Sequence, residues 1–108
     1  MNYRVSSIPL FDKQAKRLSR KYRSLKSDLA ILIKSLENHP QQGIALGNNF
    51  YKIRLSISSK GKGRSGGARI ITYVKIVIST VYLTSIYDKS EKTTITDKEL
   101  EQIFKTLS

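Results

Sequence analysis

Residues 50–57, FYKIRLSI, change the periodicity of the chain from helical to alternating. Alternate residues of a strand point to opposite faces, which separates Tyr51, Ile53, Leu55 and Ile57 from Phe50, Lys52, Arg54 and Ser56. Two β-branched runs follow, ARIITYV at 68–74 and VISTVYLTSIY at 77–87. The gap at residues 75–76 is too short for a parallel crossover, which needs about a dozen residues. We therefore expect three antiparallel strands.

Upstream of these strands, residues 11–36 carry two apolar stripes with helical spacing. The stripes are Phe11, Ala15, Leu18 and Tyr22, then Leu25, Leu29, Leu32, Ile33 and Leu36. The short break near Arg23 and Ser24 predicts two helices paired as a hairpin. Residues 1–8 predict an edge strand that ends at Pro9, because proline lacks the ladder donor. Pro40, Gly43 and Gly47 predict a loop after the hairpin.

Residues 96–107 carry the clearest helix signal. Thr96 and Glu99 have the spacing of a capping box, and Ile95 with Leu100 fits a hydrophobic staple. The apolar stripe behind them is Leu100, Ile103, Phe104 and Leu107. The order β-α-α-β-β-β-α predicts one α+β domain over residues 1–108. We expect a small, twisted, antiparallel-rich sheet, packed by the N-terminal helical hairpin and the C-terminal helix.

The composition is strongly basic. The 108 residues include 20 Lys and Arg but only 8 Asp and Glu, giving a net charge of +12, and no Cys. This charge favours a polyanionic partner, and the lack of Cys excludes disulfides and thiolate chemistry. The most apolar stretch, residues 70–83, is too short and too polar to span a bilayer, and the N-terminus does not resemble a signal peptide. We expect a soluble cytoplasmic protein that does not bind membranes.

The positive charge concentrates in the acid-free stretch from Asn38 through Tyr87. Lys52 and Arg54 are two residues apart on a strand, so they share one face. Arg69 joins them if it lies opposite Arg54 across the sheet. Three cations would then form a phosphate-binding surface; otherwise they are unconnected surface charges on edge strands.

Two further basic segments admit two interpretations each. The loop cations Lys60, Lys62 and Arg64, in KGKGRSGG, either follow an RNA backbone or lie in a solvated loop; the segment lacks P-loop spacing. The face of the first helix that carries Lys13, Lys16, Arg17 and Arg20 is either simply solvated or, as the family resemblance described below implies, contacts ribosomal RNA.

The common catalytic constellations are missing from the sequence. His39 is the single histidine, and no cluster of acids could hold Mg²⁺, so we expect no metal and no cofactor. A hydrolase of this composition would have to rely on cations that stabilise a phosphorane-like transition state. RNA suits such a site because its 2′-hydroxyl is a built-in nucleophile.

Several segments, in this order, resemble RelE/HigB-type toxins of bacterial type II toxin–antitoxin systems: FYKIRLSI, GGARIITYV and VYLTSIYDKSEK. KGKGRSGGARII followed by IYDKSEK is most similar to the HigB-like branch. The resemblance implies a microbial-RNase-like RelE fold and cleavage of mRNA in the ribosomal A site. It also implies neutralisation by an antitoxin, encoded by the adjacent gene, with an acidic or helical contact segment.

The resemblance also implies roles for individual residues. Lys52 and Arg54 match the paired basic residues of the family, and Arg69 matches the arginine that grips the scissile phosphate. Lys89 lies where the family often places an arginine that assists as a proton donor to the leaving oxygen. The tyrosine proposed as general base falls at Ile95, which cannot serve, so Tyr87 and Glu91 are the alternatives.

Three other functions compete with mRNA cleavage. A ParE-like relative would poison DNA gyrase, but such a protein has no need of the Lys52, Arg54 and Arg69 set. A non-catalytic RNA-binding module would present stacking aromatics, and only Phe50 shares the face of these cations unless the register adds Tyr73. An inactive relative is the remaining alternative.

Overall fold

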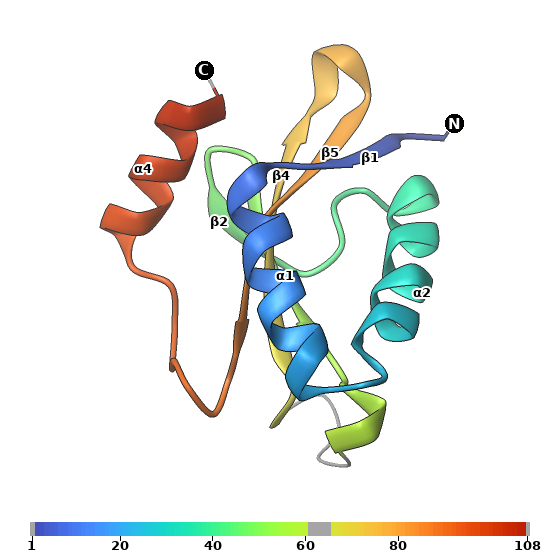
Figure 1. Cartoon of the computed structure of the whole chain (residues 1–108). Coiled ribbons are helices and arrows are strands. Elements are labelled where there is room, and N and C mark those ends of the chain that lie inside the picture. Colours follow the sequence, from blue (N-terminus) through green and yellow to red (C-terminus); the bar gives the residue numbers. More distant parts are fainter. Residues whose placement is uncertain (1, 61–65, 108) are drawn as a thin grey trace.

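The computed structural model describes residues 2–60 and 66–107 and confirms the α+β class (Figure 1). Its elements are β1 (Arg4–Ser7), α1 (Pro9–Lys21), α2 (Leu25–Asn38), β2 (Ile44–Gly47), β3 (Phe50–Leu55), the 3₁₀ turn η1 (Ser58–Lys60), β4 (Ala68–Lys75), the 3₁₀ turn η2 (Ile76–Ile78), β5 (Thr80–Asp88) and α4 (Asp97–Leu107). No helix within the described ranges is long and apolar enough to cross a membrane.

The strands form one open, mixed sheet in the order β1-β5-β4-β3-β2. β4 pairs antiparallel with both β3 and β5, as the short connections predict. β1 is an edge strand, also as predicted, and it pairs parallel to β5. β1 ends at Ser7 because Pro9 opens α1 almost directly after the strand and turns the chain out of the sheet.

The second edge strand, β2, is absent from the sequence-based prediction, which placed a loop there. β2 pairs antiparallel with β3, with an irregularity between Ala45 and Gly47. Gly43 and Gly47 have φ values of +99° and +94°, and Asn48 and Asn49 are also left-handed. Gly47, Asn48 and Asn49 make a tight hairpin turn into β3, whereas Gly43 precedes β2. A strand of only four residues that ends in a glycine carries too little periodicity to be recognised.

The connection between β4 and β5 is longer than predicted. Residues 77–79 were expected to lie in the strand, but Val77 is in η2 and β5 begins at Thr80. Ser79 adopts a left-handed conformation with φ of 48°, which lets the chain reverse after η2. Val77 and Ile78 in this turn are β-branched, so the sequence pattern there predicts a strand.

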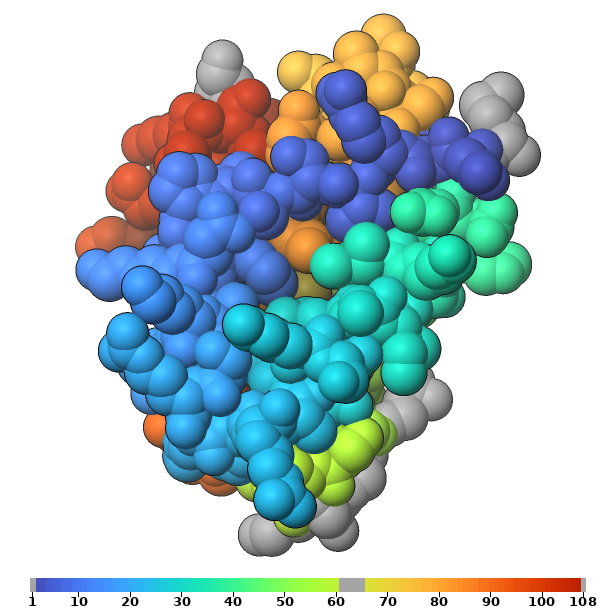
Figure 2. Space-filling model, turned by 45° about the vertical axis from the view of Figure 1, so that its right-hand side comes forward, coloured from blue at the N-terminus to red at the C-terminus, as the bar shows by residue number. Residues whose placement is uncertain are grey.

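The predicted hairpin of α1 and α2 lies over one face of the sheet; Figure 2 shows the two helices side by side, with atoms of β5 visible in a hollow between them. Tyr22, just after α1, donates a hydrogen bond to Asp88 at the end of β5, which ties the helices to this face. The core beneath includes the fully buried Leu18, Leu25, Leu36, Ile70 and Ile86.

α4 packs on the opposite face. The ring of Phe104 lies 6.3 Å from that of Phe50 and 6.0 Å from that of Tyr73, which are register partners on β3 and β4. The predicted capping box is confirmed, because Thr96 N–H donates to Glu99 Oε1 at 2.9 Å and Glu99 N–H donates to Thr96 Oγ1 at 3.1 Å. α4 therefore starts where the sequence indicates.

Candidate active site

Arg54, Arg69 and Tyr87 form a row across the three central strands. Arg54 on β3 is the register partner of Arg69 on β4, and Arg69 is the partner of Tyr87 on β5. Register partners point to the same face of a sheet, with Cβ atoms about 4.5–5.5 Å apart. The expected pairing of Arg54 with Arg69 is thus confirmed, and we call these three residues the arginine–tyrosine row.

Lys52 lies two residues from Arg54 on the same face, opposite Ile71. Ile71 is in turn the register partner of Ser85 on β5. Phe50 and Tyr73 come next along the strands, so the register does bring Tyr73 beside Phe50, at 5.1 Å between ring centroids. The cations and the aromatic rings under α4 therefore occupy one continuous face of the sheet.

The arginines of the row differ in exposure. Arg54 is exposed, whereas Arg69 is only 5% exposed. Burial lowers the pKa of the Arg69 guanidinium and repulsion by Arg54 lowers it further, against an opposing effect of Tyr87. Arg69 Nη1 donates to the carbonyl of Ala68 at 3.2 Å. Like charges directly opposite each other destabilise a sheet, so this pair points to an anionic ligand.

Tyr87 closes the row on β5. Its side chain is 6% exposed, and its hydroxyl has no hydrogen-bond partner among the described residues. Lys92 Nζ lies 5.4 Å from the centroid of the Tyr87 ring, and Lys92 is ion-paired with Glu99 of α4. Burying a hydroxyl without a hydrogen-bond partner costs free energy. The Tyr87 hydroxyl is therefore a candidate functional group.

Lys89 follows the row by two residues. Its backbone N–H donates to Gly67 O at 3.0 Å, which extends the pairing of β4 with β5. Its ammonium donates to the carbonyl of Thr93 at 2.8 Å. Lys89 is thus near the row along the strand, with its side chain turned to the segment that leads into α4.

Glu91, the alternative to Tyr87 as base, is held against α1. Its carboxylate lies 2.7 Å from Arg17 and 3.1 Å from Lys21. Hydrogen bonds from Arg17 and Lys21 lower the pKa of Glu91. Of the two alternatives, Tyr87 is the one that lies in the row.

Asp88 is an important residue that sequence reasoning did not single out. Its carboxylate, fully buried, accepts hydrogen bonds from Lys60 at 2.7 Å, Tyr22 at 2.5 Å and Ser90. Burial acts to raise the pKa of Asp88, but these bonds outweigh it and hold that pKa well below its usual range. The available signal was an acid at the buried end of an apolar strand, which needs partners.

The remaining predicted RNA-binding residues are not all equivalent in the structure. Lys60 lies in η1 rather than in a solvated loop, and its side chain, 10% exposed, is paired with Asp88. Arg17 is paired with Glu91, whereas Lys13, Lys16 and Arg20 are exposed on α1. Lys62 and Arg64 lie outside the described residues. Within the described ranges, no group of acidic and histidine side chains could hold a metal ion.

The fold and the row define a class of small, basic α+β proteins with two arginines opposite each other on one face of the sheet. The chain belongs to the RelE family: the family described as the RelE toxin of the RelE/RelB toxin–antitoxin system matches residues 10–108. A search of curated proteins finds no match.

Solved structures share the fold at low sequence identity. An arginine double mutant of Escherichia coli toxin RelE in the free state is 15% identical, with a TM-score of 0.66 and complete (100%) coverage of both chains. A chain of the RelBE2 toxin–antitoxin complex of Mycobacterium tuberculosis is 13% identical, with a TM-score of 0.57. The match covers 82% of this chain and 92% of that one. A chain of the intact E. coli RelBE complex is 20% identical, with a TM-score of 0.51, and the match covers 80% of this chain and 95% of that one.

Proposed function

We propose that this RelE-family toxin inhibits translation in the cytoplasm by metal-independent endonucleolytic cleavage of mRNA in the ribosomal A site. A cognate antitoxin would neutralise it. Family membership supports the toxin class, and the arginine–tyrosine row supports the chemistry. The proposal names Lys52, Arg54, Arg69, Tyr87 and Lys89 as the catalytic residues.

The pairing of Arg54 with Arg69 is the observation that carries this proposal. Two guanidinium groups side by side on one sheet face, with no carboxylate among their register partners, match the charge of a phosphodiester whose negative charge grows during attack. Guanidinium also offers two parallel donors to phosphate oxygens. Because Arg69 is nearly buried, the exposed Arg54 would meet the RNA first, and the surroundings of Arg69 would open locally.

The proposed reaction is an internal transesterification. The 2′-oxygen of one nucleotide attacks the adjacent phosphorus, and the bond from phosphorus to the 5′-oxygen of the next nucleotide breaks. The proton of the 2′-hydroxyl passes to a base, which we assign to Tyr87 in its deprotonated, phenolate form, so that the step leaves a neutral Tyr87 hydroxyl. The departing oxygen receives a proton from the Lys89 ammonium, which becomes a neutral amine. The products are a 2′,3′-cyclic phosphate and a 5′-hydroxyl, so neither water nor a metal enters this step.

Mapping of RNA ends tests the proposal. The purified chain is incubated with a model mRNA, with and without programmed ribosomes, and the new 5′ ends and their chemistry are determined. Cleavage with 5′-hydroxyl ends on ribosomes is the expected result. Intact mRNA together with inhibited DNA gyrase would instead favour the ParE-like alternative.

A further inference from the structure

The ammonium of Lys92 lies against the arginine–tyrosine row, although the proposed reaction assigns it no task. Its Nζ lies over the Tyr87 ring, 5.4 Å from the ring centroid. Tyr87 is the register partner of Arg69, and Arg69 is the partner of Arg54. Positive groups therefore flank Tyr87 in two directions: Arg69 on the neighbouring strand β4, and Lys92 over the ring.

A turn directly after β5 brings Lys92 back to this place. Its backbone N–H donates to the carbonyl of Asp88 at 3.0 Å. The Asp88 carboxylate in turn accepts a hydrogen bond from the backbone N–H of Ser90 at 2.9 Å, which fixes the start of the turn. Lys89, in the same turn, donates instead to a main-chain carbonyl of the following segment. The turn thus places Lys92 over Tyr87 and sends Lys89 to a different partner.

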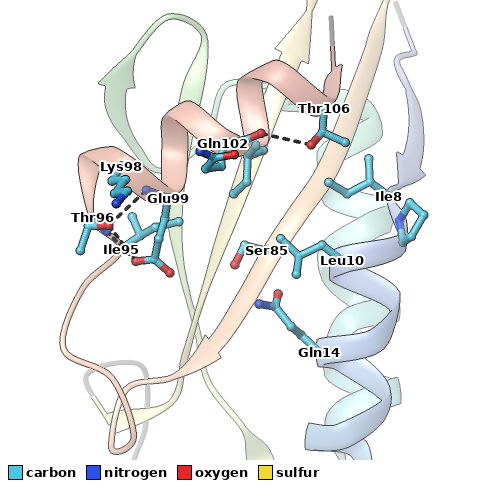
Figure 3. Close-up of a pocket in the computed structure, with 12 residues that line it drawn as sticks. Ile8, Leu10, Gln14, Ser85, Ile95, Thr96, Lys98, Glu99, Gln102 and Thr106 are labelled. Carbon is cyan, nitrogen blue, oxygen red and sulfur yellow. Dashed lines mark hydrogen bonds between the residues drawn. The ribbon is translucent and has the colours of Figure 1, made fainter.

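Glu99 of α4 holds the Lys92 ammonium. Its two carboxylate oxygens have separate partners, because Oε1 accepts the capping hydrogen bond from Thr96 N–H, whereas Oε2 accepts from Lys92. Figure 3 shows Thr96 and Glu99 joined by dashed lines at the start of α4. The hydrogen bond from Lys92 lowers the pKa of Glu99, so this carboxylate is ionised at neutral pH. Lys92 can therefore leave Glu99 without removing the cap of α4.

The ion pair of Lys92 with Glu99 is open to exchange. Its two side chains are 33% and 41% exposed, and an exposed ion pair is held weakly. A phosphate oxygen offers the same ammonium a charge-assisted hydrogen bond. Lys60 differs, because its partner Asp88 is fully buried and its departure would leave that carboxylate without its closest cation. Lys92 is thus the better placed of these two lysines to meet a ligand from solvent.

We propose that Lys92 is a further catalytic residue of the cleavage site, which exchanges Glu99 for a non-bridging oxygen of the scissile phosphate. The inference rests on the proposed function for the reaction that it assists. Lys92 keeps its proton and donates a hydrogen bond, so the phosphate lies between this ammonium and the guanidinium groups of Arg54 and Arg69. Negative charge grows on that oxygen as the phosphorane forms, and a cation beside it stabilises the transition state. Glu99 holds the ammonium at the row until RNA binds.

Variants at the two ends of the ion pair separate catalysis from packing. Lys92→Ala and Glu99→Gln both break the pair, but a Gln side chain keeps the capping box because its carbonyl oxygen can accept from Thr96. We expect Lys92→Ala to lower the second-order rate constant of cleavage on programmed ribosomes by about tenfold or more, with partial recovery in Lys92→Arg. Glu99→Gln should cut at least as fast as wild type, since its Lys92 is released. Lys98→Ala removes the same charge at an exposed position of α4, where solvent and salt screen it, and should stay within about twofold of wild type.

A binding measurement tests Lys92 without cleavage. A short RNA with 2′-O-methyl groups lacks the nucleophile of the proposed reaction and cannot be cut by it. When this RNA is titrated into the isotopically labelled full-length protein, the NMR resonances of Lys92 Nζ and of the Glu99 carboxylate should both shift, since the two groups part. The Nζ resonance of Lys98 is the control and should shift less.

The outcomes distinguish this inference from the cleavage proposal. If wild type cuts mRNA and Lys92→Ala cuts as fast, or if Lys92→Ala and Glu99→Gln lose activity equally, the inference is wrong and the cleavage proposal stands. If wild type leaves mRNA intact, the cleavage proposal fails, and an RNA-dependent shift at Lys92 still supports its contact with phosphate. A Lys92 Nζ resonance that the RNA does not move overturns the inference in either case.

Discussion

The ammonium of Lys60 lies 2.7 Å from the fully buried carboxylate of Asp88, joining η1 to the end of β5 across 28 positions of the chain. The same carboxylate accepts a hydrogen bond from Tyr22, just after α1. Lys60 also lies 5.3 Å from the centroid of the Tyr22 ring. Asp88 therefore joins two separate segments, η1 and the end of α1, to the end of β5, where Tyr87 and Lys89 are its sequence neighbours.

Removing Lys60 should destabilise the fold. In Lys60→Ala, Asp88 keeps its bonds to Tyr22 and Ser90 but loses its closest cation, and we expect a loss of about 2 kcal/mol in the free energy of unfolding. Urea denaturation followed by circular dichroism measures the change. Lys26→Ala, at an exposed position of α2, should stay within about 0.5 kcal/mol of wild type. Equal stability of the two variants would refute the assigned role of Lys60.

Asp88 should make the free energy of unfolding depend on pH in the acid range. Hydrogen bonds hold the pKa of Asp88 in the folded protein below its usual range, so the unfolded chain takes up the proton first as the pH falls. Its stabilisation is thus fully present above about pH 5 and is lost progressively below about pH 4.

The comparison with Asp88→Asn isolates this effect, because the other acids titrate in both proteins. The difference in unfolding free energy between wild type and Asp88→Asn, measured in urea from pH 7 to pH 3, should be largest near neutrality and shrink in acid. A difference that is constant over this range would contradict the prediction.

Cleavage should depend strongly on Arg69. We expect Arg69→Ala to slow single-turnover cleavage on programmed ribosomes by about 10²-fold or more, the scale of losing one preorganised donor. Arg69→Lys should recover part of the rate, since Lys lacks the bidentate geometry. Lys52→Ala and Arg54→Ala should act in the same direction, with losses that do not add.

Arg4→Ala, an exposed arginine on β1, is the matched control and should cut at the wild-type rate. Circular dichroism checks that each variant is folded, which matters most for the buried Arg69. Because Arg54 is exposed, Arg54→Ala tests the row even if Arg69→Ala does not fold. If folded variants of both arginines cut at the wild-type rate, the proposed catalytic site would be refuted.

The row was predictable from sequence in part. Alternation along residues 50–57 places Lys52 and Arg54 on one face, and the antiparallel arrangement follows from short connections. The register that sets Arg54 opposite Arg69 is fixed by side-chain packing and by the chain between the strands, so it needed the structure.

The hydrogen bonds of Asp88 could not be predicted from local sequence patterns. Its partners Tyr22 and Lys60 are 66 and 28 positions away, and nothing in the spacing of either residue refers to Asp88. The same holds for Gln14, whose bond to Ile86 joins residues 72 positions apart. Such pairs arise only when helices have docked on the sheet.

Chelation should leave cleavage intact. The described residues offer no group of ligands for a metal, and the proposed reaction uses the 2′-hydroxyl as nucleophile. We expect the single-turnover rate to be unchanged by EDTA under conditions where sedimentation shows intact ribosomes. Loss of cleavage on intact ribosomes that Mg²⁺ restores would contradict the metal-independent mechanism.

Tyr87→Phe should separate the function of the Tyr87 hydroxyl from its part in folding. The hydroxyl is buried without a hydrogen-bond partner among the described residues, so its removal takes away a desolvated polar group and leaves the ring in place. We expect the unfolding free energy to be unchanged or higher by about 1 kcal/mol. If Tyr87 accepts the 2′-hydroxyl proton, the cleavage rate should fall by about 10²- to 10⁴-fold. Tyr82→Phe, a half-buried tyrosine of the same strand outside the row, is the control and should leave the rate unchanged. A stable Tyr87→Phe protein that cuts as fast as this control would show that the base is another group.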